Sequence, residues 1–119
     1  DPDWVELKNP TDGTADLSGF VVRDSKTPFS LPAGTTIPAG GYLVVFCDDS
    51  PVGAPADRIH LPFKLGGADS FSLLDAAATP ISTATWDAVS APTGKSYGRL
   101  PDGTGLFMAL TPTRGARNI

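Results

Sequence analysis

The sequence predicts an all-β sandwich of about eight short, mostly antiparallel strands. Three observations indicate this class. Several short segments alternate apolar and polar residues, which is the pattern of strands with one buried face. The 13 glycines and 12 prolines are spread along the chain and separate these segments at the spacing of turns. They also interrupt every stretch in which the 3.6-residue apolar repeat of an amphipathic helix could form.

The composition narrows the functional class. With 119 residues, no internal repeat and no linker, residues 1–119 are expected to form one domain. Hydrophobic residues make up 40% and charged residues 18%, which excludes a disordered tail. No apolar run approaches the ~20 residues of a membrane helix, so we expect no membrane insertion. The net charge of −4 repels phosphate backbones and argues against generic nucleic-acid binding.

The first half of the chain provides four strands. Residues 4–8 alternate, with two apolar side chains on one face and two charged ones on the other, and therefore form a half-buried strand. Leu17 is expected to reach the core from the following loop. Residues 20–23 and 29–31 are short strands. Residues 42–47 are apolar throughout and β-branched in the middle, which predicts a central strand covered on both faces.

The second half begins with an irregular polar loop at residues 48–59. A strand is expected from about His60 through the alternating Leu61, Phe63 and Leu65, and Pro62 makes it an edge or a bent segment. Residues 75–78 are a connection in which the alanines allow a single helical turn. The remaining strands are expected at residues 71–74, 81–86, 96–100 and 106–110, with a Pro-Asp-Gly turn before the last of them.

Several segments in order resemble the lamin tail domain family. Residues 4–11 (WVELKNPT) and 16–20 (DLSGF) resemble its opening, and residues 37–45 (IPAGGYLVV) its central element. Residues 63–65 (FKL), 96–99 (SYGR) and 111–118 (TPTRGARN) resemble its later landmarks. The resemblance implies an immunoglobulin-like β-sandwich. Its closest type is that of bacterial exported proteins, where such a domain sits beside nucleases, phosphatases, kinases or adhesive modules, and it implies an extracellular or cell-surface location.

One departure from that family concerns the beginning of the chain. The family usually has a further strand before the element at residues 4–8, and this chain begins too late to hold it. We therefore expect a domain excised from a larger protein. Either the chain was cut there or that edge of the sheet is open. An open edge favours self-association through strand pairing.

No motif predicts catalysis. Gly94-Lys95-Ser96-Tyr97-Gly98 matches the Gly-x-Ser-x-Gly nucleophile motif, which requires a strand-to-helix turn and a histidine base. The residues that follow include Pro101 and cannot begin a long helix, so we interpret the motif as a glycine-flanked entry into a strand. His60 is the only histidine, and we expect it on a strand surface, facing solvent or bonded locally. We therefore expect no catalytic residue and no enzyme.

The candidate metal ligands are few. One histidine and one cysteine cannot form a tetrahedral zinc site. The pairs Asp48/Asp49 and Asp1/Asp3 are candidates for calcium, although no Asp-x-Asp-x-Asp-Gly loop is present and solvated loop carboxylates are the alternative. Cys47 ends the most apolar strand and is expected to be a buried small hydrophobe. We expect no cofactor.

Two interpretations of function remain open. The first is a non-catalytic interaction, adhesion or scaffolding module of a larger exported bacterial protein, with an unknown protein, polymer or surface as partner. The alternative is a substrate-targeting accessory domain of an extracellular enzyme, which binds nucleic acid or carbohydrate through a basic or aromatic face. Four late basic residues either form such a face or keep edge strands soluble, and the tryptophans either fill the core or serve as exposed anchors. These residues are Lys95, Arg99, Arg114 and Arg117, with Trp4 and Trp86.

Overall fold

The computed structural model describes residues 3–49, 59–90, 95–100 and 102–118. These residues form eleven strands and no helix, which confirms the all-β prediction. The strands are β1 (Asp3–Lys8), β2 (Ala15–Asp16), β3 (Val21–Arg23), β4 (Pro28–Ser30), β5 (Thr36–Ile37), β6 (Tyr42–Cys47), β7 (Ile59–His60), β8 (Asp69–Leu74), β9 (Pro80–Trp86), β10 (Ser96–Leu100) and β11 (Leu106–Leu110).

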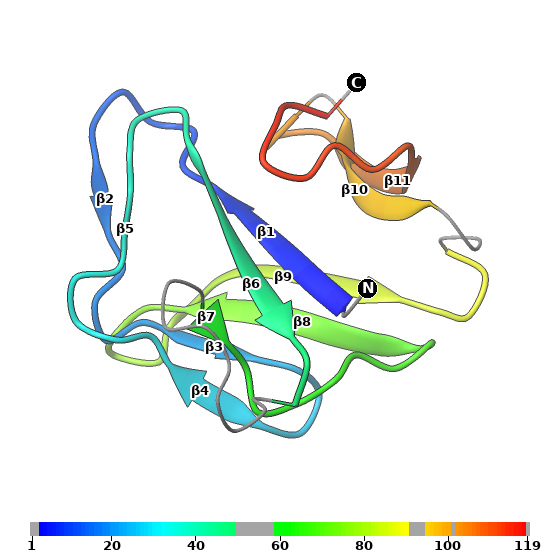
Figure 1. Cartoon of the computed structure of the whole chain (residues 1–119), viewed down its shortest axis with the longest axis horizontal. Coiled ribbons are helices and arrows are strands. Elements are labelled where there is room, and N and C mark those ends of the chain that lie inside the picture. Colours follow the sequence, from blue (N-terminus) through cyan, green and yellow to red (C-terminus); the bar gives the residue numbers. More distant parts are fainter. Residues whose placement is uncertain (1–2, 50–58, 91–94, 101, 119) are drawn as a thin grey trace.

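Two sheets form the layers of the sandwich. One has the strand order β1-β6-β7 and the other the order β4-β3-β8-β9. In Figure 1, β1 and β6 cross in front of β8 and β9. The pairs β2–β5 and β10–β11 are separate two-stranded sheets, and Figure 1 shows them at opposite sides of the molecule. Both major sheets place side chains in one core, which is what defines a sandwich.

The core lies between the two layers. Val45 of β6 and Val22 of β3 are both 0% exposed, and Phe71 of β8 is buried with them. Leu17 joins this cluster from outside the major sheets, and its N–H donates to the Thr35 carbonyl at 2.8 Å. The expectation that Leu17 fills the core from a loop is therefore confirmed. Burial of each such side chain contributes about 1.5–3 kcal/mol to the free energy of unfolding.

β6 is central, as predicted for residues 42–47, but only one of its two faces is buried, which corrects the expectation that both faces are covered. β6 pairs antiparallel with β1 and parallel with β7. Its inward residues Val45 and Cys47 are buried, whereas Tyr42, Val44 and Phe46 on the opposite face are only partly covered. Alternation thus gives β6 one core face and one face that another part of the chain covers incompletely.

The turn before β6 depends on two glycines. Gly40 has a φ of +64°, a conformation that favours glycine. A Cβ on Gly41 would lie 2.8 Å from Cγ of Pro38, so this position has no room for a side chain. The buried Asn9 side chain holds the same region, because its Nδ2 donates to the Ile37 carbonyl at 3.0 Å.

Some expected elements differ in the structure. The strand near His60 contains only Ile59 and His60, and residues 61–65 lie outside strands, which corrects the prediction. Pro62 lacks the N–H that a ladder would need. Leu61 and Phe63 are nevertheless buried, and the Leu61 N–H donates to the Phe46 carbonyl at 2.8 Å.

The connections contain further differences. The two-residue strands β2 and β5 are additional to the expected set. The helical turn allowed at residues 75–78 is instead a tight turn, in which Ala78 has a φ of +64° and the Asp75 carboxylate accepts from the Thr79 N–H at 2.9 Å. The expected polar loop at residues 48–59 lies mostly outside the described residues.

Candidate functional site

The outward face of the β1–β6–β7 sheet gathers most of the charged and aromatic side chains that the sequence highlighted. Because Val5 and Leu7 point into the core, their neighbours Trp4, Glu6 and Lys8 point outward. The strand register places these three residues beside Phe46, Val44 and Tyr42, respectively. On β7, His60 pairs with Phe46. A row of rings therefore crosses the three strands.

The C-terminal segment, residues 102–118, docks on this face through Asp102. Oδ2 of Asp102 accepts hydrogen bonds from Lys8 Nζ at 2.5 Å and from the Tyr42 hydroxyl at 2.7 Å, and Oδ1 accepts from the Asn118 N–H at 2.8 Å. Burial raises the pKa of Asp102, but these three hydrogen bonds outweigh it and lower the pKa to about 2. The side chain is 4% exposed, so a buried charged hydrogen-bond cluster joins the segment to β1 and β6.

A second contact of the C-terminal segment lies farther along β1. The Arg114 guanidinium lies 5.8 Å from the Trp4 ring centroid and 5.7 Å from that of Phe46, within the range of cation–π attraction. The next residue, Gly115, donates its N–H to Glu6 Oε2 at 2.5 Å. Burial is the main cause of the raised pKa of Glu6. Trp4 and Arg114, both candidates for an external ligand, are thus in contact with each other.

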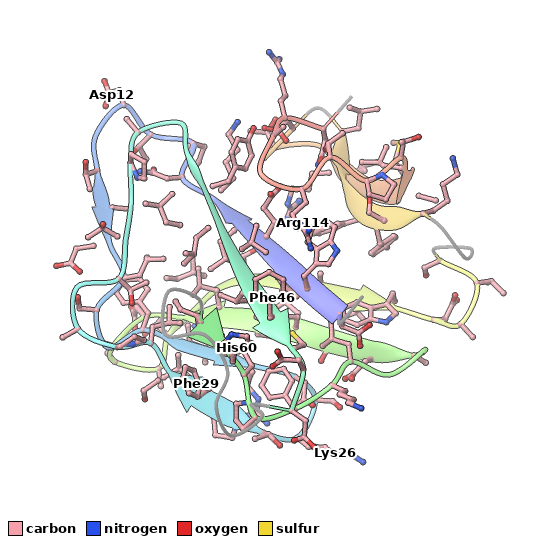
Figure 2. The ribbon with its side chains drawn as sticks, in the orientation of Figure 1. Asp12, Lys26, Phe29, Phe46, His60 and Arg114 are labelled. Carbon is pink, nitrogen blue, oxygen red and sulfur yellow. The ribbon has the colours of Figure 1, made fainter. Side chains whose placement is uncertain are left out.

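His60 forms a hydrogen bond with Asp48. Its Nδ1 lies 2.5 Å from Asp48 Oδ2, and its ring stacks on Phe46 with centroids 5.8 Å apart. Figure 2 shows Phe46 between His60 and Arg114. The expectation of a locally bonded histidine is confirmed. Among the described residues, His60 Nε2 and Asp48 Oδ1 are buried without hydrogen-bond partners.

The serine of the Gly-x-Ser-x-Gly motif has a structural contact. Ser96 begins β10, and its hydroxyl donates to the Leu110 carbonyl across the hairpin at 3.3 Å. The motif therefore enters a strand, as expected, rather than a helix. His60 Nε2, the atom that would have to accept the serine proton, has no partner among the described residues, so this structure does not join Ser96 and His60 in a triad.

Two of the candidate calcium ligands are engaged by contacts within the protein. Asp48 is engaged by His60, and Asp3 Oδ2 accepts from the Leu65 N–H at 3.1 Å. Asp49 is exposed, and Asp1 lies outside the described residues. In the described part of the chain, no group of three or more histidine, cysteine or acidic residues converges as metal ligands would.

Cys47 is 1% exposed, as expected for a small core hydrophobe. Burial is the main cause that raises the pKa of its thiol to about 12, and nearby carboxylates add to the effect. The thiolate, which is the reactive form, is therefore strongly disfavoured at neutral pH.

The late basic residues divide between two places. Arg99 lies 4.2 Å from the Phe107 ring centroid and donates to the Gly105 carbonyl, whereas Arg114 lies over β1 and β6. Lys95 and Arg117 are exposed. Tyr97 stacks on Phe107 with centroids 5.3 Å apart, so one face of the β10–β11 hairpin is aromatic and basic.

Trp86 belongs with the core rather than with an exposed anchor. It is half-buried, packs against the core cluster and donates its indole N–H to the Gly66 carbonyl at 3.0 Å. The sequence left open whether Trp86 fills the core or serves as an exposed anchor, and the structure supports a place in the core.

An exposed apolar row on β11 was not predicted from the sequence. Leu106 is 82% exposed and Met108 is 40% exposed, and the alternation of the strand places them on the same face. Gly98 lies opposite Met108 in the register and offers no side chain to cover it. The segment LFMAL is apolar throughout, so its sequence does not indicate which of its two faces remains uncovered.

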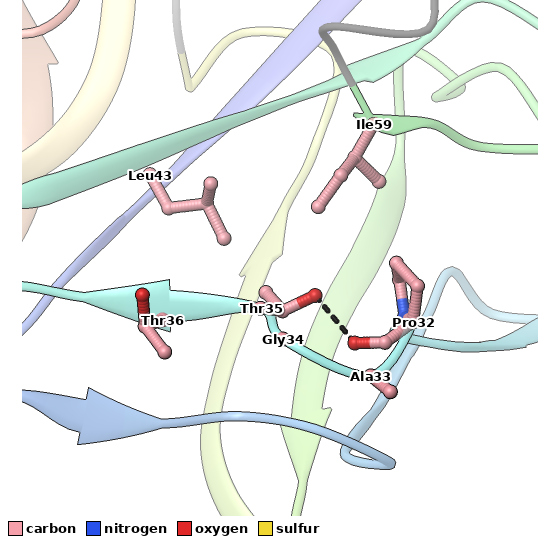
Figure 3. Close-up of a pocket in the computed structure, with 7 residues that line it drawn as sticks. All are labelled: Pro32, Ala33, Gly34, Thr35, Thr36, Leu43 and Ile59. Carbon is pink, nitrogen blue, oxygen red and sulfur yellow. Dashed lines mark hydrogen bonds between the residues drawn. The ribbon is translucent and has the colours of Figure 1, made fainter.

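A shallow, open depression of about 300 Å³ lies between the loop at residues 32–36 and the side chains of Leu43 and Ile59 (Figure 3). Its described lining contains no ionisable side chain, and the Thr35 hydroxyl is already bonded to the Pro32 carbonyl at 2.7 Å. The depression therefore offers little to orient a polar ligand.

The architecture defines a class of protein: an immunoglobulin-like all-β sandwich. Comparison with protein families gives the family itself. The Lamin Tail Domain model matches residues 1–88, and the chain belongs to the lamin tail domain family. The resemblance at residues 4–65 is thereby confirmed, whereas the landmarks at 96–99 and 111–118 lie outside the match and stay predictions.

The chain has no match among curated proteins. Within the ranges that the structure describes, no helix has the length and apolar character needed to cross a bilayer. The lamin tail domain is a β-domain family whose members are often protein-interaction modules.

Proposed function

We propose that this chain is a non-catalytic interaction module of a larger exported bacterial protein, located outside the cell or at its surface. Its partner would be a protein, polymer or surface that covers the apolar row of Leu106 and Met108. The observation that carries the proposal is the exposure of these two neighbouring side chains on one face of β11. Single exposed apolar residues are ordinary, but adjacent ones on a regular strand form a surface that gains free energy when a partner covers it.

The absence of catalysis in this proposal is supported by how the reactive types of side chain are used. Ser96 is bonded within its hairpin, His60 is bonded to Asp48, and Cys47 is buried. Each of these groups has a contact that serves the fold. The surface of β11, in contrast, contributes little to the fold and is available to a partner.

Site-specific photo-crosslinking tests the proposal. A photoreactive amino acid at position 106 is expected to yield discrete crosslinked products in the exported fraction of the organism that makes the protein. The same group at exposed Ala77, in the turn after β8, serves as the control. The Met108→Lys change should reduce crosslinking from position 106. Equal labelling from positions 106 and 77, or no effect of Met108→Lys, would contradict the proposal.

A second candidate function is supported by the other face of the same hairpin. Arg99, Phe107 and Tyr97 form a stacked basic and aromatic group of the kind that binds bases or sugar rings. A substrate-targeting accessory domain would bind single-stranded DNA with an affinity that falls with salt, or a glycan. Arg99→Ala should weaken that binding and the exposed Lys95→Ala should change it less. If neither ligand class binds, this alternative fails while the first remains.

A further inference from the structure

Strand β9 has an edge that the described part of the molecule leaves unpaired. It is the last strand of the order β4-β3-β8-β9, and its ladder partner is β8. Its seven residues make it the longest described strand, and five of the seven are exposed. Figure 1 shows it running the length of the four-stranded sheet. Unpaired N–H and C=O groups along such an edge are a template for another strand.

The other edges of the two major sheets have features that discourage strand addition. β1 bears Glu6 and Lys8, which the C-terminal segment engages. β4 has three residues and includes Pro28, and β7 has only two residues. Short strands, prolines and charges are the usual means by which proteins protect their edges.

β9 has few of these features. It contains no charged residue, and its only proline is the first residue of the strand. The register shifts between Leu73 and Leu74, so an irregularity is confined to the beginning of β9. Residues 82–86 therefore present a regular and uncharged edge.

We propose that a second copy of this chain pairs antiparallel with β9, across a two-fold axis at Ala84. The sequence around that residue is Thr-Ala-Thr, which is the same in both directions. The two-fold axis then places Thr83 of one copy opposite Thr85 of the other, twice, and Ala84 opposite itself. Threonine pairs across antiparallel strands are favourable, and no like charges meet. This symmetry favours a second copy over an unrelated strand, because an isologous contact requires self-complementarity.

The outward orientation of both threonines supports this geometry. Phe71 of the core lies opposite Ala84, so the neighbouring Thr83 and Thr85 point away from the core and are exposed. Pairing would join two four-stranded sheets into one continuous sheet. The surface involved differs from the β11 row, so this inference goes beyond the proposed function and does not depend on it.

Analytical ultracentrifugation across about 1 µM to 1 mM tests the pairing. The wild-type chain should show a monomer–dimer equilibrium, and higher salt should tighten it because each copy carries a net charge of −4. Thr83→Lys with Thr85→Lys places lysines opposite each other and should weaken dimerisation about tenfold or more. The matched control, Ser30→Lys with Ala33→Lys, adds the same charge at exposed positions in and beside β4 and should weaken it less.

A monomeric wild-type chain at 1 mM and high salt would overturn the inference, as would equal weakening by both double variants. Hydrogen exchange of the unmodified chain provides a measurement that does not depend on the folding of a variant. Among residues 82–86, the alternate amides that point to the free edge should become more protected as the protein concentration rises, with no comparable change in the amides that face β8 or in β4. Crosslinking from position 106 is expected to persist in the lysine variant, so the two proposals can fail separately.

Discussion

Replacing Asp102 with asparagine should release the C-terminal segment from the sheet. The pKa of Asp102 is lowered from 3.8 to about 2, and this difference corresponds to about 2 to 3 kcal/mol of preferential stabilisation of the charged carboxylate in the folded state. The side chain of its partner Lys8 is 24% exposed to solvent, so water screens part of the interaction between the two charges. We therefore expect Asp102→Asn to lower the free energy of unfolding by about 2 kcal/mol at pH 7.

The stabilisation by Asp102 should be present at neutral pH and lost in acid. A carboxyl whose pKa is depressed by folding contributes fully above its unfolded pKa of 3.8 and loses that contribution as the pH falls through about 2. Urea denaturation should therefore separate wild type from Asp102→Asn at pH 7 and separate them by only a few tenths of a kcal/mol at pH 2. Hydrogen exchange at Asn118, whose N–H is bonded to Asp102, should accelerate in the variant at pH 7.

The control for charge alone is Asp12→Asn, because Asp12 is exposed in the turn between β1 and β2 and points away from the molecule in Figure 2. It should change stability by no more than about 0.5 kcal/mol. A variant at Asp102 that is as stable as wild type at pH 7, or one equally destabilised at pH 7 and pH 2, would refute the reasoning.

Three other predictions rest on burial. Glu6→Gln should increase the free energy of unfolding at neutral pH, because burial raises the pKa of Glu6 and so disfavours the charged form in the folded state. In urea titrations this increase should vanish below pH 4.5, and a lower free energy of unfolding at pH 7 would contradict the prediction. Cys47 should resist thiol reagents at pH 8 until urea unfolds the chain, whereas rapid native labelling would show that its burial is not maintained. Leu61→Ala should lower the free energy of unfolding by about 2–5 kcal/mol, because Leu61 is 0% exposed. Leu106→Ala should lower it by no more than about 0.5 kcal/mol, because Leu106 is 82% exposed. Calorimetry measures both values, and similar values would disprove the assignment of Leu61 to the core.

The alternation of side chains predicted the two layers because it reports burial directly. Residues 4–8 lie in β1, and the alternate apolar side chains Val5 and Leu7 pack against the core. Residues 42–47 form β6; they are apolar throughout, and it was this continuous run that predicted a central strand. The same reasoning failed after His60. Leu61 and Phe63 alternate as they would in a strand and are both buried, yet Pro62 keeps this segment outside the ladder. Alternation indicates which side chains are buried, and the hydrogen bonding of the backbone has to be judged separately.

The two-residue strands β2 and β5 could not be predicted from the alternation of apolar and polar residues. β2 and β5 pair only Ala15 with Ile37 and Asp16 with Thr36. Two residues cannot display a period of two, and the pairing depends on how the loops on either side are closed. Asn9 illustrates the same limit, because its amide reaches carbonyls that lie up to 29 residues later in the chain.

The outward face of β1 shows why the candidate site was harder to predict than the fold. Glu6 and Lys8 alternate with core residues, which is the pattern of side chains that face water. In the structure Glu6 instead accepts a hydrogen bond from Gly115 and Lys8 donates one to Asp102, across sequence separations of 109 and 94 residues. The alternation of a strand indicates which side chains face the core and which face away from it. It does not indicate whether the side chains that face away contact water or another segment of the chain.

The covering segment lies beyond the part of the chain that the family model matches. That match ends at residue 88, whereas the contacts on β1 and β6 come from residues 102–118. The surface of this lamin tail domain is therefore determined by the C-terminal segment as well as by the shared sandwich. The same region of the chain covers one face of the sandwich and exposes a new apolar one at Leu106 and Met108.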